Sequence, residues 1–291
     1  MTSHYKKKIL FVLPLFLFLL LFTVSCNIQS NEPSTDTTPP LIDGSETPND
    51  KEPANGNNQL EEPKGDDEEP STDKGETDLQ VDSIKYYVNQ NYFIKPLDPE
   101  QDNKVVLLTF DDAPQNKVTK EILDILDKHN AKAIFFINGH YAVKSMELVK
   151  EIADRGHILA NHTWWHENLK NLDYNKSVEE IVKVNDLIEE VTGERPKYFR
   201  PPFGVTSDLA REIIATEGMQ SMNWSLGSLD WEYTSPDDSE KVLNQVIDNL
   251  IPGVNILMHD KEVTANALDE MLTKIEEAGY TFVLPTEVII D

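Results

Sequence analysis

The stretch VVLLTFDD, residues 105–112, decides how we expect this chain to fold. Its first four residues are β-branched or leucine, which is typical of a strand buried on both faces, and it ends in two carboxylates. Parallel α/β folds collect their reactive side chains at the carboxyl ends of such strands. The stretch therefore predicts one strand of a parallel sheet with functional residues at its end.

Similar short apolar runs alternate with amphipathic stretches up to residue 284. Glycine follows several of the amphipathic stretches, as is typical of a left-handed helix C-cap. The alternation indicates an α/β fold, a distorted (β/α) barrel with about seven parallel strands, and an open doubly wound sheet is the alternative. We expect strands at 105–110, 133–138, 157–161, 198–200, 219–225, 254–259 and 281–284, and helices at 117–129, 143–155, 177–191, 207–217, 239–250 and 265–278.

The first 26 residues have the pattern of a secretory signal. Three lysines at 6–8 precede an apolar run at 9–22, and Cys26, the only cysteine of the chain, follows shortly after. The position of Cys26 resembles the lipobox of bacterial lipoproteins, although Thr23 stands where that motif usually carries leucine. We therefore expect residues 1–26 to be a lipoprotein signal peptide, with the chain extracytoplasmic and held at the membrane by a lipid on Cys26. An uncleaved anchor helix is the alternative.

The following segments differ sharply in composition. Residues 27–80 carry 15 acidic residues, 3 lysines and 7 of the chain's 17 prolines. Such a segment buries too little apolar surface to offset its ordering entropy, so we expect a disordered acidic tether. We expect residues 81–103 to be an extension packed on the barrel, which then occupies residues 104–291. The net charge of -26 repels polyanions and excludes nucleic acid as a partner.

A pair of histidines provides the clearest chemical signal. His162 and His166 are four residues apart, so we expect their imidazoles on one face of a helical turn, where a carboxylate from a strand end could complete a His-His-Asp set. Three protein ligands leave positions open for water and substrate, which is typical of a catalytic metal ion. Zinc is our first expectation, and cobalt or nickel would also suit these ligands.

Five short motifs occur in order along the chain, and together they resemble those of the polysaccharide deacetylases of the NodB homology family, carbohydrate esterase family 4. The resemblance covers about residues 104–288. It implies a NodB-like fold and an enzyme that removes acetyl groups from a glycan. The motifs are Thr109-Phe110-Asp111-Asp112, His162-Thr163-Trp164-Trp165-His166, Arg200-Pro201-Pro202-Phe203-Gly204, Asp230-Trp231 and Leu257-Met258-His259.

The resemblance assigns the metal ligands and the base. It implies that Asp112, His162 and His166 bind one divalent metal ion and that Asp111 is the general base that takes a proton from water. Neighbouring side chains of a strand point in opposite directions, which would let the two aspartates face different partners.

The third motif is implied to support the base and the oxyanion. Arg200 would pair with Asp111, because a nearby guanidinium lowers the pKa of a carboxylate and keeps it ionised. The backbone N–H of Phe203 would donate to the oxyanion of the reaction. A purely structural salt bridge is the alternative for Arg200.

The last two motifs are implied to serve the leaving group and the acetyl group. His259 resembles the general acid, and Asp230 resembles the carboxylate that keeps this imidazole protonated. Trp231 and Leu257 resemble the walls of a small apolar pocket for a methyl group. Core packing is the alternative for these two residues.

Two departures from the family pattern affect details. Ala113-Pro114 replaces the usual Gly-Pro after the aspartates, so this loop would adopt a positive φ less readily. Trp164 and Trp165 are bulkier than the pair often found between the metal histidines, and we expect them to pack beneath the groove rather than narrow it.

The sequence therefore predicts a metal-dependent polysaccharide deacetylase. We expect a monomer that removes N-acetyl groups from an extracellular amino sugar polymer, with peptidoglycan as the first candidate. One alternative is a hydrolase of a small cyclic amide, and another is a non-catalytic surface lipoprotein that binds glycan.

Overall fold

The computed structural model describes residues 84–289. The expected signal peptide at 1–26 with its lipidation site Cys26, and the expected tether at 27–80, lie outside the described residues. Within residues 84–289, no helix combines the length and apolar character needed to cross a bilayer.

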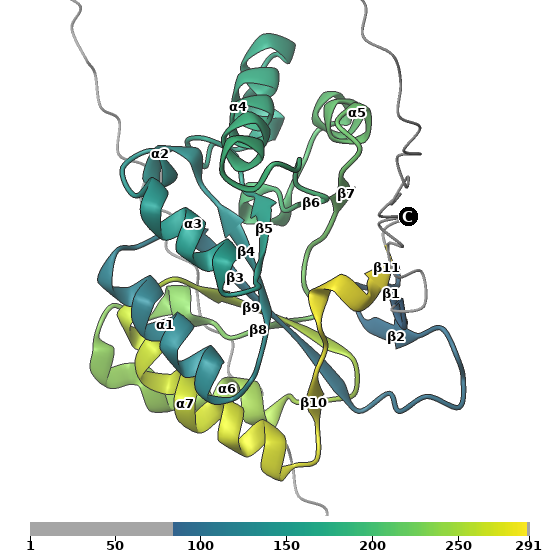
Figure 1. Ribbon diagram of the computed structural model, residues 1–291, viewed down its shortest axis with the longest axis vertical. Coiled ribbons are helices and arrows are strands. Elements are labelled where there is room, and N and C mark those ends of the chain that lie inside the picture. The colour runs from purple at the N-terminus through teal and green to yellow at the C-terminus, as the bar shows by residue number, and fades with distance from the viewer. Residues whose placement is uncertain (1–83, 290–291) are drawn as a thin grey trace, which may run out of the picture. The chain divides into compact units, whose positions relative to one another are not determined.

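One curled parallel sheet forms the centre of the described chain (Figure 1). Its strands run in the order β7-β6-β5-β4-β3-β9-β8, and β10 pairs with the first residues of β3. The prediction of a distorted barrel with about seven parallel strands is confirmed. The strands are β3 (Val105–Ala113), β4 (Ala133–Ile137), β5 (Ile158–Asn161), β6 (Tyr198–Phe199), β7 (Gln220–Ser221), β8 (Leu226–Gly227), β9 (Val254–His259) and β10 (Thr281–Phe282).

The strand expected at 219–225 is divided between the two edges of the sheet. Its first part is β7, after which the Met222 N–H donates to the Phe199 carbonyl at 2.8 Å. The Ser225 N–H instead donates to the Asn255 carbonyl of β9 at 3.1 Å, and β8 follows on that edge. Three residues of chain span at most about 10 Å, so the two edges lie close together. The chain segment 222–225 connects these two edges, and β7 and β8 do not pair with each other.

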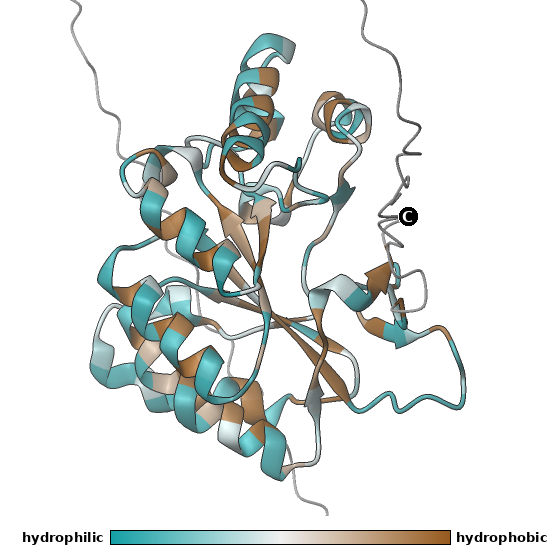
Figure 2. Ribbon diagram, viewed as in Figure 1, coloured by the Kyte–Doolittle hydropathy of each residue, from teal (hydrophilic) through white to brown (hydrophobic). Residues whose placement is uncertain are grey.

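Amphipathic helices cover the outside of the sheet. Figure 2 shows their apolar stripes turned toward the strands and their polar faces turned toward solvent. All six expected helices are present, and a short helix α2 precedes the second of them. The helices are α1 (Lys117–Lys128), α2 (Gly139–Ala142), α3 (Met146–Asp154), α4 (Tyr174–Thr192), α5 (Asp208–Thr216), α6 (Ser239–Asp248) and α7 (Glu262–Glu277).

Side chains of β3 alternate between two buried clusters. Leu108 belongs to the cluster between the sheet and the helices, whereas Leu107 belongs to the cluster inside the barrel. Thr109 and Asp111 continue the inner row of side chains, because residues two apart in a strand share a face. The inner row of this central strand therefore ends in a carboxylate at the carboxyl end of the barrel.

The extension packs against the inner cluster. Strands β1 (Tyr86–Val88) and β2 (Ile94–Pro96) pair with each other, and β1 also pairs with β11 (Val288–Ile289). Ile94 is fully buried in the inner cluster, and its N–H donates to the Gly253 carbonyl at 2.7 Å. Gly253 has a φ of +83°, and a Cβ there would lie 2.2 Å from the Ile94 carbonyl oxygen, so this close contact requires glycine.

Candidate active site

The predicted site residues gather at one pocket beside the carboxyl ends of the central strands. The pocket has a volume of about 630 Å³. Arg200 and Asp230 are fully buried, and the other eight predicted residues line the pocket: Asp111, Asp112, His162, His166, Phe203, Trp231, Leu257 and His259.

Asp112 reaches the pocket through a β-bulge. In a regular strand Asp112 would follow Leu108 and Phe110 to the outer face of the sheet. Instead its φ is +63°, the register with β4 shifts between Asp111 and Ala113, and Ala113 takes the next buried outer position. The bulge, rather than simple alternation, therefore brings Asp112 next to Asp111. The positive φ falls on aspartate, which tolerates it better than most residues, and Ala113 needs none.

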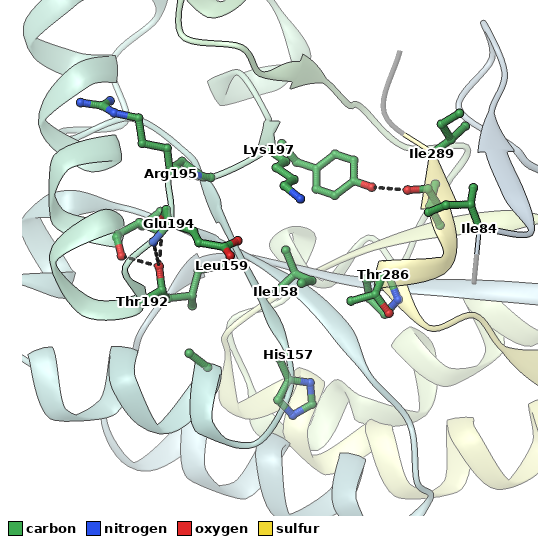
Figure 3. Close-up of a pocket in the computed structure, with 16 residues that line it drawn as sticks. Ile84, His157, Ile158, Leu159, Thr192, Glu194, Arg195, Lys197, Thr286 and Ile289 are labelled. Atoms are coloured by element: carbon green, nitrogen blue, oxygen red, sulfur yellow. Dashed lines mark hydrogen bonds between the residues drawn. The ribbon is translucent and has the colours of Figure 1, made fainter. Parts of the chain in front are cut away.

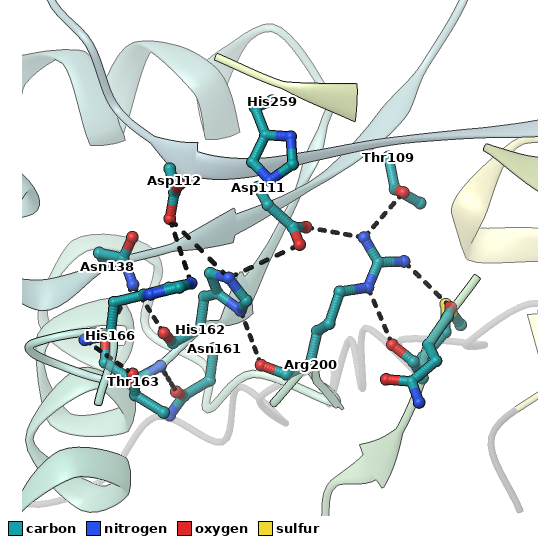
Figure 4. A network of polar contacts seen from close by, with 12 residues as sticks. Thr109, Asp111, Asp112, Asn138, Asn161, His162, Thr163, His166, Arg200 and His259 are labelled. Atoms are coloured by element: carbon teal, nitrogen blue, oxygen red, sulfur yellow. Dashed lines mark hydrogen bonds and ion pairs between the residues drawn. The ribbon is translucent and has the colours of Figure 1, made fainter. Parts of the chain in front are cut away.

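His162 and His166 lie in the loop after β5, so the prediction that they share a helical turn is wrong. Thr163 and His166 have positive φ values of 66° and 60°. Asn161 Oδ1 accepts the Thr163 N–H at 2.8 Å, and Thr163 Oγ1 accepts the His166 N–H at 3.1 Å (Figure 4). These side-chain hydrogen bonds shape the loop, and the two imidazole centroids lie 4.9 Å apart.

Asp112, His162 and His166 form a cluster that could hold a metal ion, and we call it the metal cluster. Their ligand atoms lie within 4.8 Å of one another, and each Nε2 is 3.8 Å from Asp112 Oδ1. This separation is too long for a hydrogen bond. It is close to the spacing of about 3.4 Å between two ligands that are each about 2.1 Å from a tetrahedral ion.

The tautomer of His162 also suits a metal ligand. Its Nδ1 is 2.7 Å from the Arg200 carbonyl oxygen, which can only accept, so Nδ1 carries the proton. In the neutral ring with this tautomer, the lone pair is on Nε2, which faces the metal cluster. The donor set fits a divalent ion with three protein ligands.

Asp111 lies beside the metal cluster and is held by Arg200. Arg200 Nη1 donates to Asp111 Oδ1 at 2.7 Å, while Asp111 Oδ2 is 3.6 Å from His162 Nε2. Burial alone would raise the pKa of Asp111, but the nearby charges, above all that of Arg200, outweigh burial and lower it. Asp111 is therefore ionised, with one oxygen directed toward the metal cluster.

Arg200 connects Asp111 to the segment that closes the barrel (Figure 4). Besides Asp111, its guanidinium donates to Thr109 Oγ1 at 2.9 Å, to the Met222 carbonyl at 2.9 Å and to the Asn223 carbonyl at 3.1 Å. Met222 and Asn223 begin the segment that crosses between the two sheet edges. One fully buried side chain thus holds both the carboxylate and this crossing segment.

His259 lies beside Asp111, because the two residues are register partners in the neighbouring strands β9 and β3. Its Nδ1 donates to Asp230 Oδ1 at 2.7 Å, and its backbone N–H donates to Asp230 Oδ2 at 2.6 Å. Burial alone would lower the pKa of His259, but the hydrogen bond and charge of Asp230 outweigh burial and raise it. The pairing with Asp230 therefore favours the protonated form of the imidazole.

The remaining predicted residues shape the pocket walls. Leu257 is buried on the same face of β9 as His259. The Trp231 ring lies edge-on to the His259 imidazole, with centroids 5.5 Å apart. Phe203 has a φ of +59°, and its exposed ring lies edge-on to His166 at 4.8 Å. The role of the Phe203 N–H toward an oxyanion stays a prediction.

Several supporting residues were not predicted from the sequence. Asn138 donates to the His162 carbonyl at 2.6 Å, and its position directly after β4 is a signal that could have identified it. Thr264 on α7 donates to Asp230 Oδ2 at 2.6 Å. Asp260 accepts the Gln115 N–H at 3.1 Å, and burial raises the pKa of Asp260 to about 7.

A second pocket of about 410 Å³ lies at the amino ends of β5 and β6 (Figure 3). His157, Lys197 and Thr286 are among its lining residues, and none of the predicted site residues lines it. Parallel α/β folds carry their reactive groups at the opposite ends of the strands. The candidate active site is therefore the pocket that contains the metal cluster.

Known proteins share this sequence pattern. The family model for polysaccharide deacetylase matches residues 98–222. The peptidoglycan-N-acetylmuramic acid deacetylase PdaA of Bacillus subtilis is 32% identical over 181 residues, which cover 62% of this chain and 69% of that protein. This chain belongs to the polysaccharide deacetylase family. The peptidoglycan-N-acetylglucosamine deacetylase of Bacillus cereus is 34% identical over 183 residues, which cover 61% of this polysaccharide deacetylase and 66% of that protein.

A solved structure also matches this polysaccharide deacetylase. BA3943 from Bacillus anthracis, described as a CE4 family pseudoenzyme, matches with a TM-score of 0.58 and 32% identity, over 65% of this chain and 67% of that chain. The fold alone therefore does not establish activity. The family match ends at residue 222, so Asp230 and His259 lie beyond it, and their hydrogen-bonded pairing is established by the geometry.

Proposed function

We propose that this chain is a metal-dependent hydrolase that removes N-acetyl groups from an extracellular amino sugar polymer, and that the polymer is peptidoglycan. The observation that carries the proposal is the placement of Asp111 and His259 as register neighbours beside the metal cluster. An ionised carboxylate and a protonated imidazole at one open metal site are the groups that hydrolysis of an amide needs.

Asp112, His162 and His166 would hold a divalent ion, with zinc as our first choice and cobalt or nickel as alternatives. When bound, the ion would polarise the acetyl carbonyl and lower the pKa of water in the site. The half-buried position of Asp112 leaves one side of the metal cluster open to the pocket.

The protein side chains move the protons. Asp111, kept ionised by Arg200, takes a proton from the water that attacks the acetyl carbon. His259, held at Nδ1 by Asp230, gives its Nε2 proton to the nitrogen as the C–N bond breaks. The products are acetate and a free amine. The Phe203 N–H donates to the oxyanion, and Trp231 and Leu257 enclose the methyl group.

The relatives support a peptidoglycan substrate without agreeing on the sugar. PdaA is named for N-acetylmuramic acid and the Bacillus cereus protein for N-acetylglucosamine. Both names describe removal of an acetyl group from an amino sugar of the same polymer. The proposal for this chain is therefore the reaction class and the polymer.

One alternative, a non-catalytic glycan-binding protein, is favoured by the likeness to a pseudoenzyme. The complete set of base, acid and metal cluster in this chain opposes it. The other alternative, hydrolysis of a small cyclic amide, has no support among the relatives reported above.

The test is release of acetate from N-acetylglucosamine oligomers and from peptidoglycan by the purified chain. We expect release to slow after chelation and to recover when zinc is added. The Asp111→Asn variant should lose it, and the matched control Asp208→Asn, which changes an aspartate with a 96% exposed side chain, should retain it. Mass spectrometry of the products identifies the sugar that loses its acetyl group. No release from any acetylated glycan with metal restored would refute the proposal.

We also propose that the chain is an extracytoplasmic monomer that is anchored to the cell membrane by a lipid on Cys26. Support comes from the lysine and apolar runs that precede this cysteine, and from the acidic tether expected after it. Palmitate should label the wild-type chain and leave Cys26→Ala unlabelled. Equal labelling of both would contradict the anchor.

A further inference from the structure

We propose that Trp165 binds the sugar ring next to the one that is deacetylated, as a stacking platform at the edge of the pocket. The inference rests on the proposed function and concerns how a polymer, rather than a single sugar, is held. It begins with the two tryptophans between the metal histidines.

The two indoles have opposite environments. Trp164 is half-buried against the outer core, and a Cβ on Gly139 would lie 2.2 Å from its Cε3 atom. Trp165 is 60% exposed. The prediction that both indoles pack beneath the groove is therefore right for Trp164 and wrong for Trp165. A tryptophan this exposed is uncommon, and the side chain is enriched at binding surfaces.

Trp165 is nevertheless held in place. Its backbone N–H donates at 2.8 Å to Oε2 of Glu180, a buried carboxylate on α4. Its ring stacks on the His140 imidazole, with centroids 5.2 Å apart and planes 24° apart. His140 is itself anchored, because its Nδ1 and its backbone N–H both bond to the Trp164 carbonyl, at 2.7 and 3.1 Å. One face of the Trp165 indole is thus covered by His140, and the residue remains largely exposed.

The platform continues into the active-site pocket. The His140 ring contacts the Tyr141 ring, with centroids 3.8 Å apart, and Tyr141 lines the pocket together with Asp112 and His166. Trp165, His140 and Tyr141 therefore form a row of neighbouring aromatic rings, and Tyr141 at one end of the row lines the pocket that contains the metal cluster. A glycan whose acetyl group enters the pocket would extend its next sugar along such a row.

The chemistry of the platform fits a pyranose ring. One face of such a ring presents C–H groups whose partial positive charge suits the negative face of an indole. A rigid aromatic ring also loses little conformational entropy when it binds a ligand. Trp165 would therefore contribute affinity that grows with the length of the glycan.

The experiment compares kcat/KM of the full chain on N-acetylglucosamine oligomers of increasing length. For the longer oligomers, Trp165→Leu should lower kcat/KM about tenfold and remove most of the increase with length. Trp165→Tyr keeps an aromatic face and should preserve most of that increase. Tyr87→Leu, at an exposed position in β1, is the matched control and should behave as wild type.

Other results would overturn the platform. One is a Trp165→Leu variant whose kcat/KM rises with oligomer length as steeply as that of the wild-type chain. Another is an equal loss of kcat/KM for every oligomer together with reduced zinc content, which would show that the indole only supports the loop that carries His162 and His166. If the wild-type chain releases no acetate from any acetylated glycan with metal restored, the proposed function fails separately. Calorimetry then tests the platform by comparing the affinity of long oligomers for Asp111→Asn and for the double variant that also carries Trp165→Leu. Equal affinities of the two proteins would refute the platform.

Discussion

Asp230 accepts two hydrogen bonds from His259, one from the imidazole Nδ1 at 2.7 Å and one from the backbone N–H at 2.6 Å. The two bonds fix both the ring and the strand end that carries it. Because Asp230 is fully buried, its charge acts on His259 with little screening by solvent. This pair sets the protonation state of the proposed acid.

Asp230→Asn should shift the alkaline limb of the pH profile of kcat/KM to lower pH. Asp230 raises the pKa of His259, the proposed acid works only when protonated, and activity is lost as pH rises through that pKa. Without the carboxylate charge this loss begins at lower pH, and kcat/KM in mildly alkaline buffer should fall at least about tenfold. Thr264→Val removes one hydrogen bond to Asp230 but keeps the charge of Asp230, so the alkaline limb of this variant should stay at the wild-type pH. An unmoved limb in Asp230→Asn would contradict this role.

Arg200→Lys should lower both activity and stability. Lysine keeps the charge but cannot donate at once to Asp111, Thr109 and the carbonyls of Met222 and Asn223, so buried acceptors lose their partners. We expect the free energy of unfolding in urea to fall by about 2–4 kcal/mol.

The matched control for this prediction is Arg211→Lys, which changes an exposed arginine that pairs with Asp208. Its unfolding free energy should change by less than about 0.5 kcal/mol. If both variants unfold at the same urea concentration as wild type, Arg200 does not stabilise the segment that crosses between the two edges of the sheet.

His162→Gln should weaken zinc binding at least about a hundredfold, because one of three ligands is lost. A competition titration with a chelating dye measures this affinity directly. His129→Gln is the control, since His129 also lies between two carboxylates, Asp269 and Glu276, but outside the metal cluster. Equal zinc affinity in both variants would show that the metal cluster does not bind the ion.

The strand ends could be predicted from the sequence because burial and alternation are local properties. Asp111 and His259 each end an apolar run, so their place at one edge of a parallel sheet followed from pattern alone. Their pairing in register depends on the whole sheet, and the resemblance to a known family, rather than the pattern, assigned their roles.

Other features could not be predicted because distant contacts determine them. The positive φ of Asp112 accompanies a register shift against β4, which the sequence around Asp112 does not indicate. The spacing of His162 and His166 suits a helix, yet distant residues hold a loop there: the Asn138 side chain donates to the His162 carbonyl, and the Glu180 carboxylate accepts the Trp165 N–H. The strand expected at 219–225 divides because its two ends pair with opposite edges of the sheet.

His157→Asn should reduce the loss of stability in acid. Burial, the largest cause, lowers the pKa of His157 to about 4, whereas the ordinary value is 6.5 (Figure 3 shows the ring beside the second pocket). The unfolded chain therefore binds a proton as pH falls below 6.5, and the folded chain does so only near pH 4. The neutral His157 ring therefore contributes its full share of the free energy of unfolding above pH 6.5, and this share is lost as pH falls from 6.5 to about 4. The share amounts to about 3 kcal/mol.

Urea unfolding of wild type and His157→Asn between neutral pH and pH 4 measures this contribution of His157 to the free energy of unfolding. Asparagine can still accept the Ala133 N–H, which lies 3.2 Å from His157 Nδ1, so the variant should fold. The carboxylates titrate in both proteins and cancel in the comparison, so the two curves should approach each other as pH falls. Curves that stay parallel would mean that His157 gains its proton equally in the folded and unfolded chain, and that the ring is more accessible to water than its 4% exposure indicates.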